Sequence, residues 1–181
     1  PIASGTPYLD GIWSYCRGGA HISKGNLAAA RLELGKIWQL ISLNDIDKHR
    51  AGPTPVSSIL RLAAHGLSGE IKQASGDIFS AIKDYESAIA IEDKNAYIEP
   101  PDWPQPIRHY LGDALLQAGQ PEKAEDVYRK DLDWHQNNGW ALFGLWQSLA
   151  AQGKSEEADE TYKKFRHAWR NADTDLTRSR I

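Results

Sequence analysis

A repeated order of residues in the second half of the chain is the feature that most constrains its fold. Two leucines, a glycine, an alanine and a tyrosine return in the same order, each 34 positions further along. They are Leu111, Leu115, Gly119, Ala124 and Tyr128 in one stretch, and Leu145, Leu149, Gly153, Ala158 and Tyr162 in the next. A period of this length is typical of stacked helical hairpins, each of which buries its apolar face against its neighbour.

A shorter signature extends the repeat into the first half of the chain. It is a glycine followed five residues later by an alanine. It occurs at Gly25 and Ala30, Gly76 and Ala81, Gly119 and Ala124, and Gly153 and Ala158. The first two of these glycines are 51 residues apart and the second and third are 43 apart, both more than the 34-residue period. The sequence therefore predicts four helical hairpins, interrupted by two insertions.

The small and large residues of the repeat have expected places in each hairpin. Gly119 and Gly153 separate apolar stretches of helical period, so both are expected in the left-handed conformation that ends a helix. Gly112 and Ala124 are small enough to let the two helices of one hairpin approach closely. A tyrosine in the second helix is expected to fill the space between neighbouring hairpins. These tyrosines are Tyr85, Tyr128 and Tyr162.

This order of glycine, alanine and aromatic residues resembles that of tetratricopeptide repeats (TPRs), most closely over residues 105–165. The resemblance implies an all-α fold: a right-handed α-α solenoid of about four TPR-like helical hairpins with two irregular insertions. The repeats are placed at about 11–42, 62–92, 105–138 and 139–171, the insertions at about 42–55 and 92–104, and a C-terminal cap at 172–181.

Single motifs carry a second resemblance. They are Tyr15-Cys16-Arg17-Gly18, Gly69-Glu70-Ile71, Glu92-Asp93, Tyr97, Glu99-Pro100-Pro101-Asp102-Trp103, Pro106, Arg108, Leu111-Gly112 and Asn138-Gly139-Trp140. Together they are similar to the C-terminal part of a bacterial family of large TPR-containing proteins, whose members are largely of unassigned function. Cys16 stands where that family has an alanine.

The expected elements follow from these patterns and from the residues that break them. Paired helices are placed at 9–23 and 26–42, 56–74 and 77–92, 105–118 and 121–134, and 139–152 and 155–171. No strand is expected, and Asn44, Gly52, Pro53 and Pro55 act as breakers in the first insertion. At 181 residues the chain is short for two independent cores, so we expect one solenoid domain.

The two ends of the chain carry expectations of their own. Because the chain begins at Pro1 and contains no methionine, we expect a fragment of a longer protein with further repeats upstream. The segment from Asp173 is expected to continue or cap the last helix, with Leu176 and Ile181 touching Trp169 or Phe165.

The composition argues against several kinds of partner. A net charge of -3 and a pI of about 6.1 leave no broad positive field for nucleic acid. No apolar run approaches the roughly 20 residues that span a bilayer. Cys16 is the single cysteine, and the six histidines lack the spacing of a zinc site. We therefore expect a soluble chain, with the cytoplasm favoured, that has no nucleic-acid, membrane, metal or cofactor partner.

Signs of catalysis are few. The chain has no glycine-rich phosphate loop and no nucleophile elbow. Glu99 with Asp102, and Asp131 with Asp133, are pairs of acids of the kind that hydrolases use. In a chain with 24 acidic residues such pairs also arise by chance. We expect a protein that is not an enzyme.

The first helix of each hairpin faces the concave surface of a solenoid, which such proteins commonly use for binding. That face combines aromatic with acidic residues, a mixture that suits a peptide or a protein segment. The second insertion, at about 92–104, is rich in proline. Together with this face it supplies the predicted ligand-binding residues: Tyr15, Arg17, Glu70, Glu99, Trp103, Arg108, His109, Asp113, Trp140 and Phe143. The leading hypothesis is a non-enzymatic scaffold that binds a protein or peptide through a concave groove.

Several alternatives stay open. Arg17, Glu70, Glu92, Glu99 and Arg108 either surround one polar pocket or, as we favour, form ion pairs that fasten the insertion. The aromatic pair on the last hairpin, Trp140 and Phe143, either contacts a partner or packs against a C-terminal helix. Two other functions remain: a sensor of a small polar ligand, and a hydrolase that uses the groove carboxylates.

Overall fold

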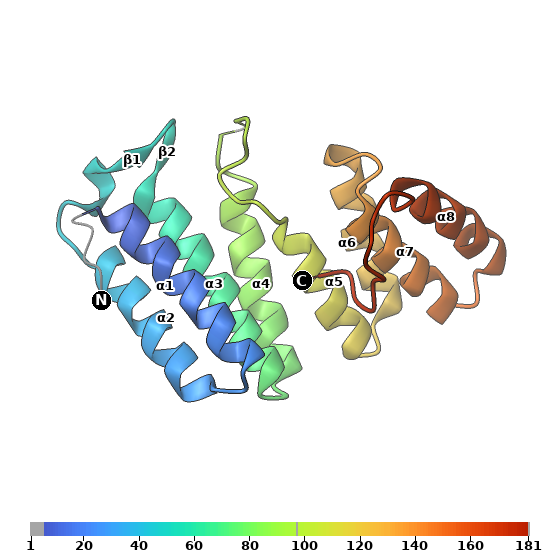
Figure 1. Ribbon diagram of the computed structural model, residues 1–181, viewed down its shortest axis with the longest axis horizontal. Helices are drawn as coiled ribbons and strands as arrows, with labels where there is room; N and C mark the ends of the chain where they lie inside the picture. The colour runs from blue at the N-terminus through green and yellow to red at the C-terminus, as the bar shows by residue number, and fades with distance from the viewer. Residues whose placement is uncertain (1–5, 97, 181) are drawn as a thin grey trace. The chain divides into compact units, whose positions relative to one another are not determined.

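The computed structural model describes residues 6–96 and 98–180, which form eight α-helices and one short antiparallel ribbon (Figure 1). The helices are α1 (Pro7–Ser23), α2 (Leu27–Ile41), α3 (Val56–Ala74), α4 (Ile78–Glu92), α5 (Ile107–Gln117), α6 (Pro121–Trp134), α7 (Gly139–Ala151) and α8 (Ser155–Ala168). A 3₁₀ turn, η1 (Ile46–Lys48), and the strands β1 (Arg50–Ala51) and β2 (Thr54–Pro55) lie between α2 and α3. The all-α class and the four helical hairpins are confirmed.

The chain divides into two compact units. Unit 1 ends at Pro104 and contains α1 to α4, whereas unit 2 begins at Gln105 and contains α5 to α8. Each unit therefore consists of two helical hairpins. The expectation that the units form one continuous domain stays a prediction.

One sequence-based expectation about the fold is wrong. No strand was expected, yet Arg50–Ala51 pairs with Thr54–Pro55 across a two-residue turn. Gly52 in that turn has a φ of 58°, which suits the tight hairpin turns that need a left-handed residue. Gly52 and Pro53 do interrupt the helical structure, as expected. The tight turn that they form also allows the residues on either side of it to pair as two short strands.

Glycines in the left-handed region close the four helical hairpins. Gly119 and Gly153 have φ values of 69° and 73°, as the sequence predicts. Gly25 and Gly76 take the same conformation, with φ values of 72° and 87°. A residue with a Cβ is strained there, so the glycine marks where the first helix of each hairpin ends.

Tyr128 on α6 sets the packing of unit 2. Its side chain is fully buried, and a Cβ built on Gly112 of α5 would lie 2.2 Å from its ring. A Cβ built on Gly144 of α7 would lie equally close to the same ring. The tyrosine thus fills the space between a helix of its own hairpin and a helix of the next, as predicted. In unit 1, Tyr85 packs in the same way against Gly69.

Tyr162 does not follow this pattern, because its side chain is 39% exposed. Within the described residues no further hairpin follows α8, so there is no second helix surface for this ring to fill. Instead it contacts Trp146, with ring centroids 5.0 Å apart. Tyr162 was expected to fill the space between two neighbouring hairpins. That role requires a hairpin after α8, which the described residues do not contain.

We predict that Gly112→Ala lowers the free energy of unfolding by about 2 kcal/mol, because the added methyl overlaps the Tyr128 ring and the core must shift. The control is Gly35→Ala, at an exposed position of α2 where an added Cβ meets nothing within 4 Å. That variant should gain up to about 1 kcal/mol from helix propensity. Chemical denaturation of both variants measures the difference, and equal stabilities would contradict this account of the packing.

Candidate functional site

The chain after α8 turns back across unit 2 and returns to α5 (Figure 1). We call residues 173–180 the return segment. Trp169 closes the turn, because its Nε1 donates a hydrogen bond to the Thr174 carbonyl at 2.6 Å. Its ring meets Trp140 of α7 edge to face, at 5.3 Å between centroids. The segment therefore does not continue the last helix, which was one of the two expectations for it.

Leu176 anchors the middle of the return segment. It packs against an apolar cluster formed by Leu142 and Phe143 of α7 and Phe165 of α8. This agrees with the expected contact between Leu176 and the Phe165 region. The matching expectation for Ile181 lies outside the described residues. The segment thus covers part of the apolar surface between α7 and α8.

Asp113 of α5 receives the end of the segment. Its side chain is 8% exposed and accepts hydrogen bonds from both Nε and Nη2 of Arg178, the former at 3.0 Å. Arg180 Nε donates to the same carboxylate at 3.2 Å, and its guanidinium lies 5.5 Å from the Tyr110 ring centroid. Two cations thus balance one largely buried acid, which would be costly to bury alone.

Ser179 lies between these two arginines and is 1% exposed. Its Oγ donates a hydrogen bond to the His109 carbonyl at 3.1 Å, so the same oxygen accepts the hydrogen of the Tyr128 hydroxyl. Burial raises the pKa of the Tyr128 phenol above its ordinary 10.0. The phenol therefore stays protonated, and remains a donor to the serine, across the physiological range.

His109 was predicted to contribute its side chain to a binding face, but the structure places it inside the hairpin. The imidazole is fully buried, with Nε2 3.0 Å from Asp131 Oδ2 on α6. The other oxygen of Asp131 lies 3.1 Å from Nδ1 of His135. The part of His109 that contacts the return segment is its backbone carbonyl.

Three predicted site residues meet in unit 1. The Tyr15 hydroxyl donates to Glu70 Oε1 at 3.2 Å, and the Tyr15 ring meets Trp103 edge to face at 4.8 Å. Trp103 is buried, and the neighbouring Asp102 accepts a hydrogen bond from Thr54 of β2. These contacts fasten the proline-rich insertion to the rest of unit 1. The sequence interpretation that we favour attributes the fastening to ion pairs, whereas these contacts are of other kinds, so that interpretation stays a prediction.

The remaining charged residues of the predicted site do not all come together. Arg17 lies two positions from Tyr15 and so on another face of α1, where its Nη2 pairs with Glu33 of α2 at 3.2 Å. The structure therefore does not bring it to Glu70. Glu99 is exposed in unit 1 and Arg108 is buried at the start of α5 in unit 2. A pocket that includes both stays a prediction.

Trp140 and Phe143 pack within unit 2. Phe143 is buried, and its ring lies 5.2 Å from Phe165 of α8 and 5.3 Å from Trp146. Trp140 contacts Trp169 at the end of α8. Of the two interpretations left open by the sequence, these contacts are those of packing against the last helix.

Arg178, Ser179, Arg180 and Tyr110 are the residues of this site that the sequence interpretation missed. The helical period ends before them, so the segment was interpreted only as a cap. One signal was available, because residues i and i+2 of an extended segment point to the same side. Two arginines at that spacing can meet one acid, which is how they contact Asp113.

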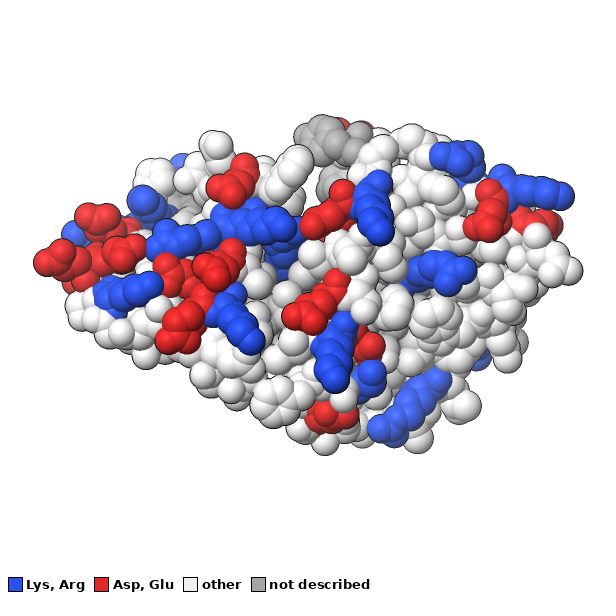
Figure 2. All heavy atoms as spheres, turned by 180° about the vertical axis from the view of Figure 1, so that it is seen from behind, with Lys and Arg blue, Asp and Glu red and all other residues white. Residues whose placement is uncertain are grey.

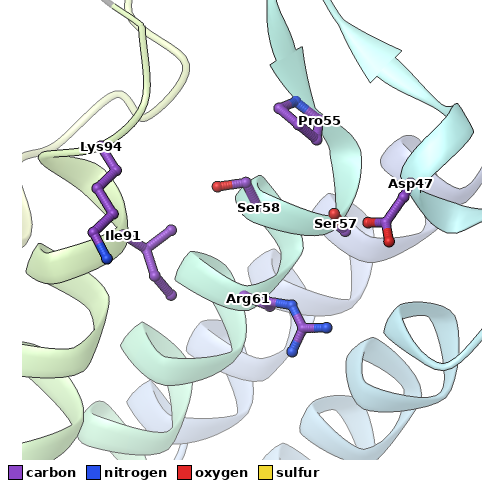
Figure 3. Close-up of a pocket in the computed structure, with 7 residues that line it drawn as sticks. All are labelled: Asp47, Pro55, Ser57, Ser58, Arg61, Ile91 and Lys94. Carbon is purple, nitrogen blue, oxygen red and sulfur yellow. The ribbon is translucent and has the colours of Figure 1, made fainter.

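Among its described residues unit 1 holds two shallow clefts, and the larger, of about 630 Å³ between α1 and α2, has the predicted site residue Arg17 in its lining. The other, of about 320 Å³, is lined by side chains from η1, α3, α4 and their flanks (Figure 3). These are Asp47, Pro55, Ser57, Ser58, Arg61, Ile91 and Lys94, none of them a predicted site residue. Across residues 6–96 and 98–180, no helix could cross a membrane, and no three His, Cys, Asp or Glu side chains gather as metal ligands.

Comparison with known proteins identifies the fold. A solved structure from Podosopora anserina, described as a kinesin light chain with nearly identical TPR-like repeats, matches 93% of this chain and 99% of its own. The TM-score is 0.55 and the sequence identity is 14%. The chain has a TPR-like fold. No protein-family model and no curated protein matches the sequence, so the resemblance to a bacterial family of large TPR proteins stays a prediction.

Glu125 on α6 connects the two hairpins of unit 2. Partial burial alone would raise its pKa, but hydrogen bonds from Lys154, Gln152 and Arg129 lower it from 4.5 to about 2. Lys154 Nζ and Gln152 Nε2 each donate at 2.7 Å to the same oxygen, Oε2. Because both donors follow α7, this carboxylate holds the second hairpin against the first.

We predict that this carboxylate makes unit 2 sensitive to acid. A lowered folded-state pKa means that the stabilisation is complete above pH 4.5 and is lost as the pH falls toward 2. Glu125→Gln should therefore melt at a lower temperature than the wild type at pH 7, and this difference should shrink between pH 4.5 and 2. Asp126→Asn, at an exposed acid of the same helix, should show almost no difference at either pH. A constant deficit of Glu125→Gln across this range would contradict the assignment.

Proposed function

We propose that this chain is a non-enzymatic scaffold that binds an extended segment of another protein along the first helices of its TPR-like hairpins. One observation carries the proposal: in unit 2 those helices, α5 and α7, already hold a non-helical segment of polypeptide. A surface that accommodates one such segment has the shape and the chemistry to accommodate another.

The contacts of the return segment are of the kind that peptide recognition uses. An apolar side chain, Leu176, packs against an apolar cluster, and a backbone carbonyl and a buried phenol bind a small polar residue, Ser179. A carboxylate of low exposure then selects positive charge. TPR-like folds in general serve as scaffolds for protein interaction through such surfaces.

Charge on the face of the molecule that Figure 2 shows gives no comparable signal. In the view of Figure 2, Lys and Arg side chains are interspersed with Asp and Glu side chains of the described residues. Mixed charge of this kind exerts little long-range attraction on a partner. Recognition on this proposal therefore depends on the local contacts of unit 2.

The two alternative functions gain no specific support. A hydrolase would use a pair of acids, but Asp131 is buried between two histidines while Asp133 is exposed. In the other candidate pair, Asp102 accepts a hydrogen bond from Thr54. A sensor of a small polar ligand would need Arg108 beside Glu99, an arrangement that stays a prediction.

The proposal is tested by placing a photoreactive residue at Gln117, an exposed position of α5 one turn from Asp113. The matched control carries the same residue at Lys130, an exposed position of the second helix α6. After irradiation of the full chain in cells of its natural source, mass spectrometry should identify a protein cross-linked from Gln117 and absent from Lys130. The same set of products from both positions, or none from Gln117, would contradict binding along the first helices.

A further inference from the structure

We propose that unit 2 binds partner segments that carry an arginine-serine-arginine sequence, and that the return segment competes with them for the same surface. The inference rests on the proposed function and names the chemistry of the partner. We define the acceptor surface as Tyr110 and Asp113 of α5, the His109 carbonyl and the Tyr128 hydroxyl. Each of these groups already contacts a side chain of residues 178–180, and Asp113 contacts two of them.

The first requirement of the acceptor surface is an arginine at the position of Arg178. Its Nε and Nη2 both donate to Asp113, one to each carboxylate oxygen. Only a planar guanidinium offers two parallel donors at this spacing, whereas the ammonium of a lysine binds as a point charge. The geometry therefore distinguishes between two residues of the same charge.

A second arginine is favoured at the position of Arg180. Its Nε donates to Asp113 Oδ2, the oxygen that also accepts a hydrogen bond from Nη2 of Arg178. Its guanidinium lies over the Tyr110 ring. Guanidinium groups are the preferred cations for such ring contacts. One carboxylate and one ring thus select positive charge two residues beyond the first arginine.

Between the arginines the acceptor surface requires a small residue that both donates and accepts a hydrogen bond. Ser179 donates to the His109 carbonyl and accepts from the Tyr128 hydroxyl. Because this serine is 1% exposed, a larger side chain finds no room there. An apolar residue of similar size would leave the buried phenol of Tyr128 without its partner, which is costly.

The return segment behaves in this scheme as a tethered competitor. It is joined to α8 by a short turn, so its effective concentration at the acceptor surface is in the millimolar range by the usual estimate for short tethers. A free segment with the same contacts must displace it. Weakening the return segment while leaving the acceptor surface intact should therefore raise the apparent affinity for a free peptide.

The test uses the full chain and a fluorescein-labelled peptide with the sequence of residues 172–180, Ala-Asp-Thr-Asp-Leu-Thr-Arg-Ser-Arg. The test variant combines Arg178→Ala with Arg180→Ala. The control variant combines Arg166→Ala with Arg170→Ala, which removes two exposed arginines near the end of α8 and gives the same net charge. Fluorescence anisotropy should show at least about tenfold tighter binding to the test variant than to the wild type or the control.

The same titration tests the chemistry of recognition. Adding Asp113→Asn to the test variant should abolish the gain in affinity, because the acceptor of both guanidinium groups is lost. A peptide with lysine in place of its first arginine, or valine in place of its serine, should bind the test variant at least about tenfold more weakly. Equal affinity of all these peptides would overturn the proposed selectivity.

The proposed competition would be overturned if the peptide bound the wild type and the test variant equally, or bound neither. The return segment would then serve only to stabilise unit 2. If circular dichroism shows the test variant to be unfolded, hydrogen exchange of the wild type decides instead. Saturating unlabelled peptide should speed amide exchange at residues 176–180, and no change would overturn the proposal. If these tests fail but Gln117 still cross-links to a protein, the proposed scaffold function stands. The partner is then recognised by a sequence other than arginine-serine-arginine.

Discussion

Tyr128 is the side chain on which both the packing of unit 2 and its candidate site depend. Its ring lies against Gly112 and Gly144, so two consecutive first helices approach each other around it. Its hydroxyl, buried by the same packing, bonds with Ser179 of the return segment. A buried phenol needs such a partner. The packing of the repeat therefore buries a hydroxyl group that needs a hydrogen-bond partner, and a segment of polypeptide on the surface of α5 can supply that partner.

The hairpins could be predicted from the sequence because their signals are local. Gly119 and Gly153 each end a helix within a few residues of the apolar pattern that defines it. The ribbon at Gly52 was missed, because breakers were taken to exclude strands although a glycine-proline turn can pair its flanks. The path of the return segment was also missed. It depends on contacts such as Arg178 with Asp113, which are 65 positions apart and which no repeat period encodes.

The candidate site was predictable only in part, for a related reason. The helical stripe selected Asp113 for the first-helix face, but could not show that the chain itself supplies cations to this carboxylate. It also selected His109, whose side chain instead contacts Asp131 between α5 and α6. In unit 1 Trp103 of the proline-rich insertion was predicted to bind a ligand, yet its ring is buried and meets Tyr15 edge to face. A periodic pattern assigns residues to the faces of a helix. Which of these faces are covered depends on non-repeating segments, here the return segment and the proline-rich insertion.

The central claim is that the return segment occupies the acceptor surface of unit 2 in solution. Nuclear Overhauser spectroscopy of the full chain tests it most directly, since protons closer than about 5 Å give cross-peaks and hydrogen-bonded groups lie well within that range. The account predicts cross-peaks between the Ser179 β protons and the Tyr128 ring protons, with dispersed shifts for residues 176–180. Random-coil shifts for these residues, with no cross-peak to Tyr128, would contradict it.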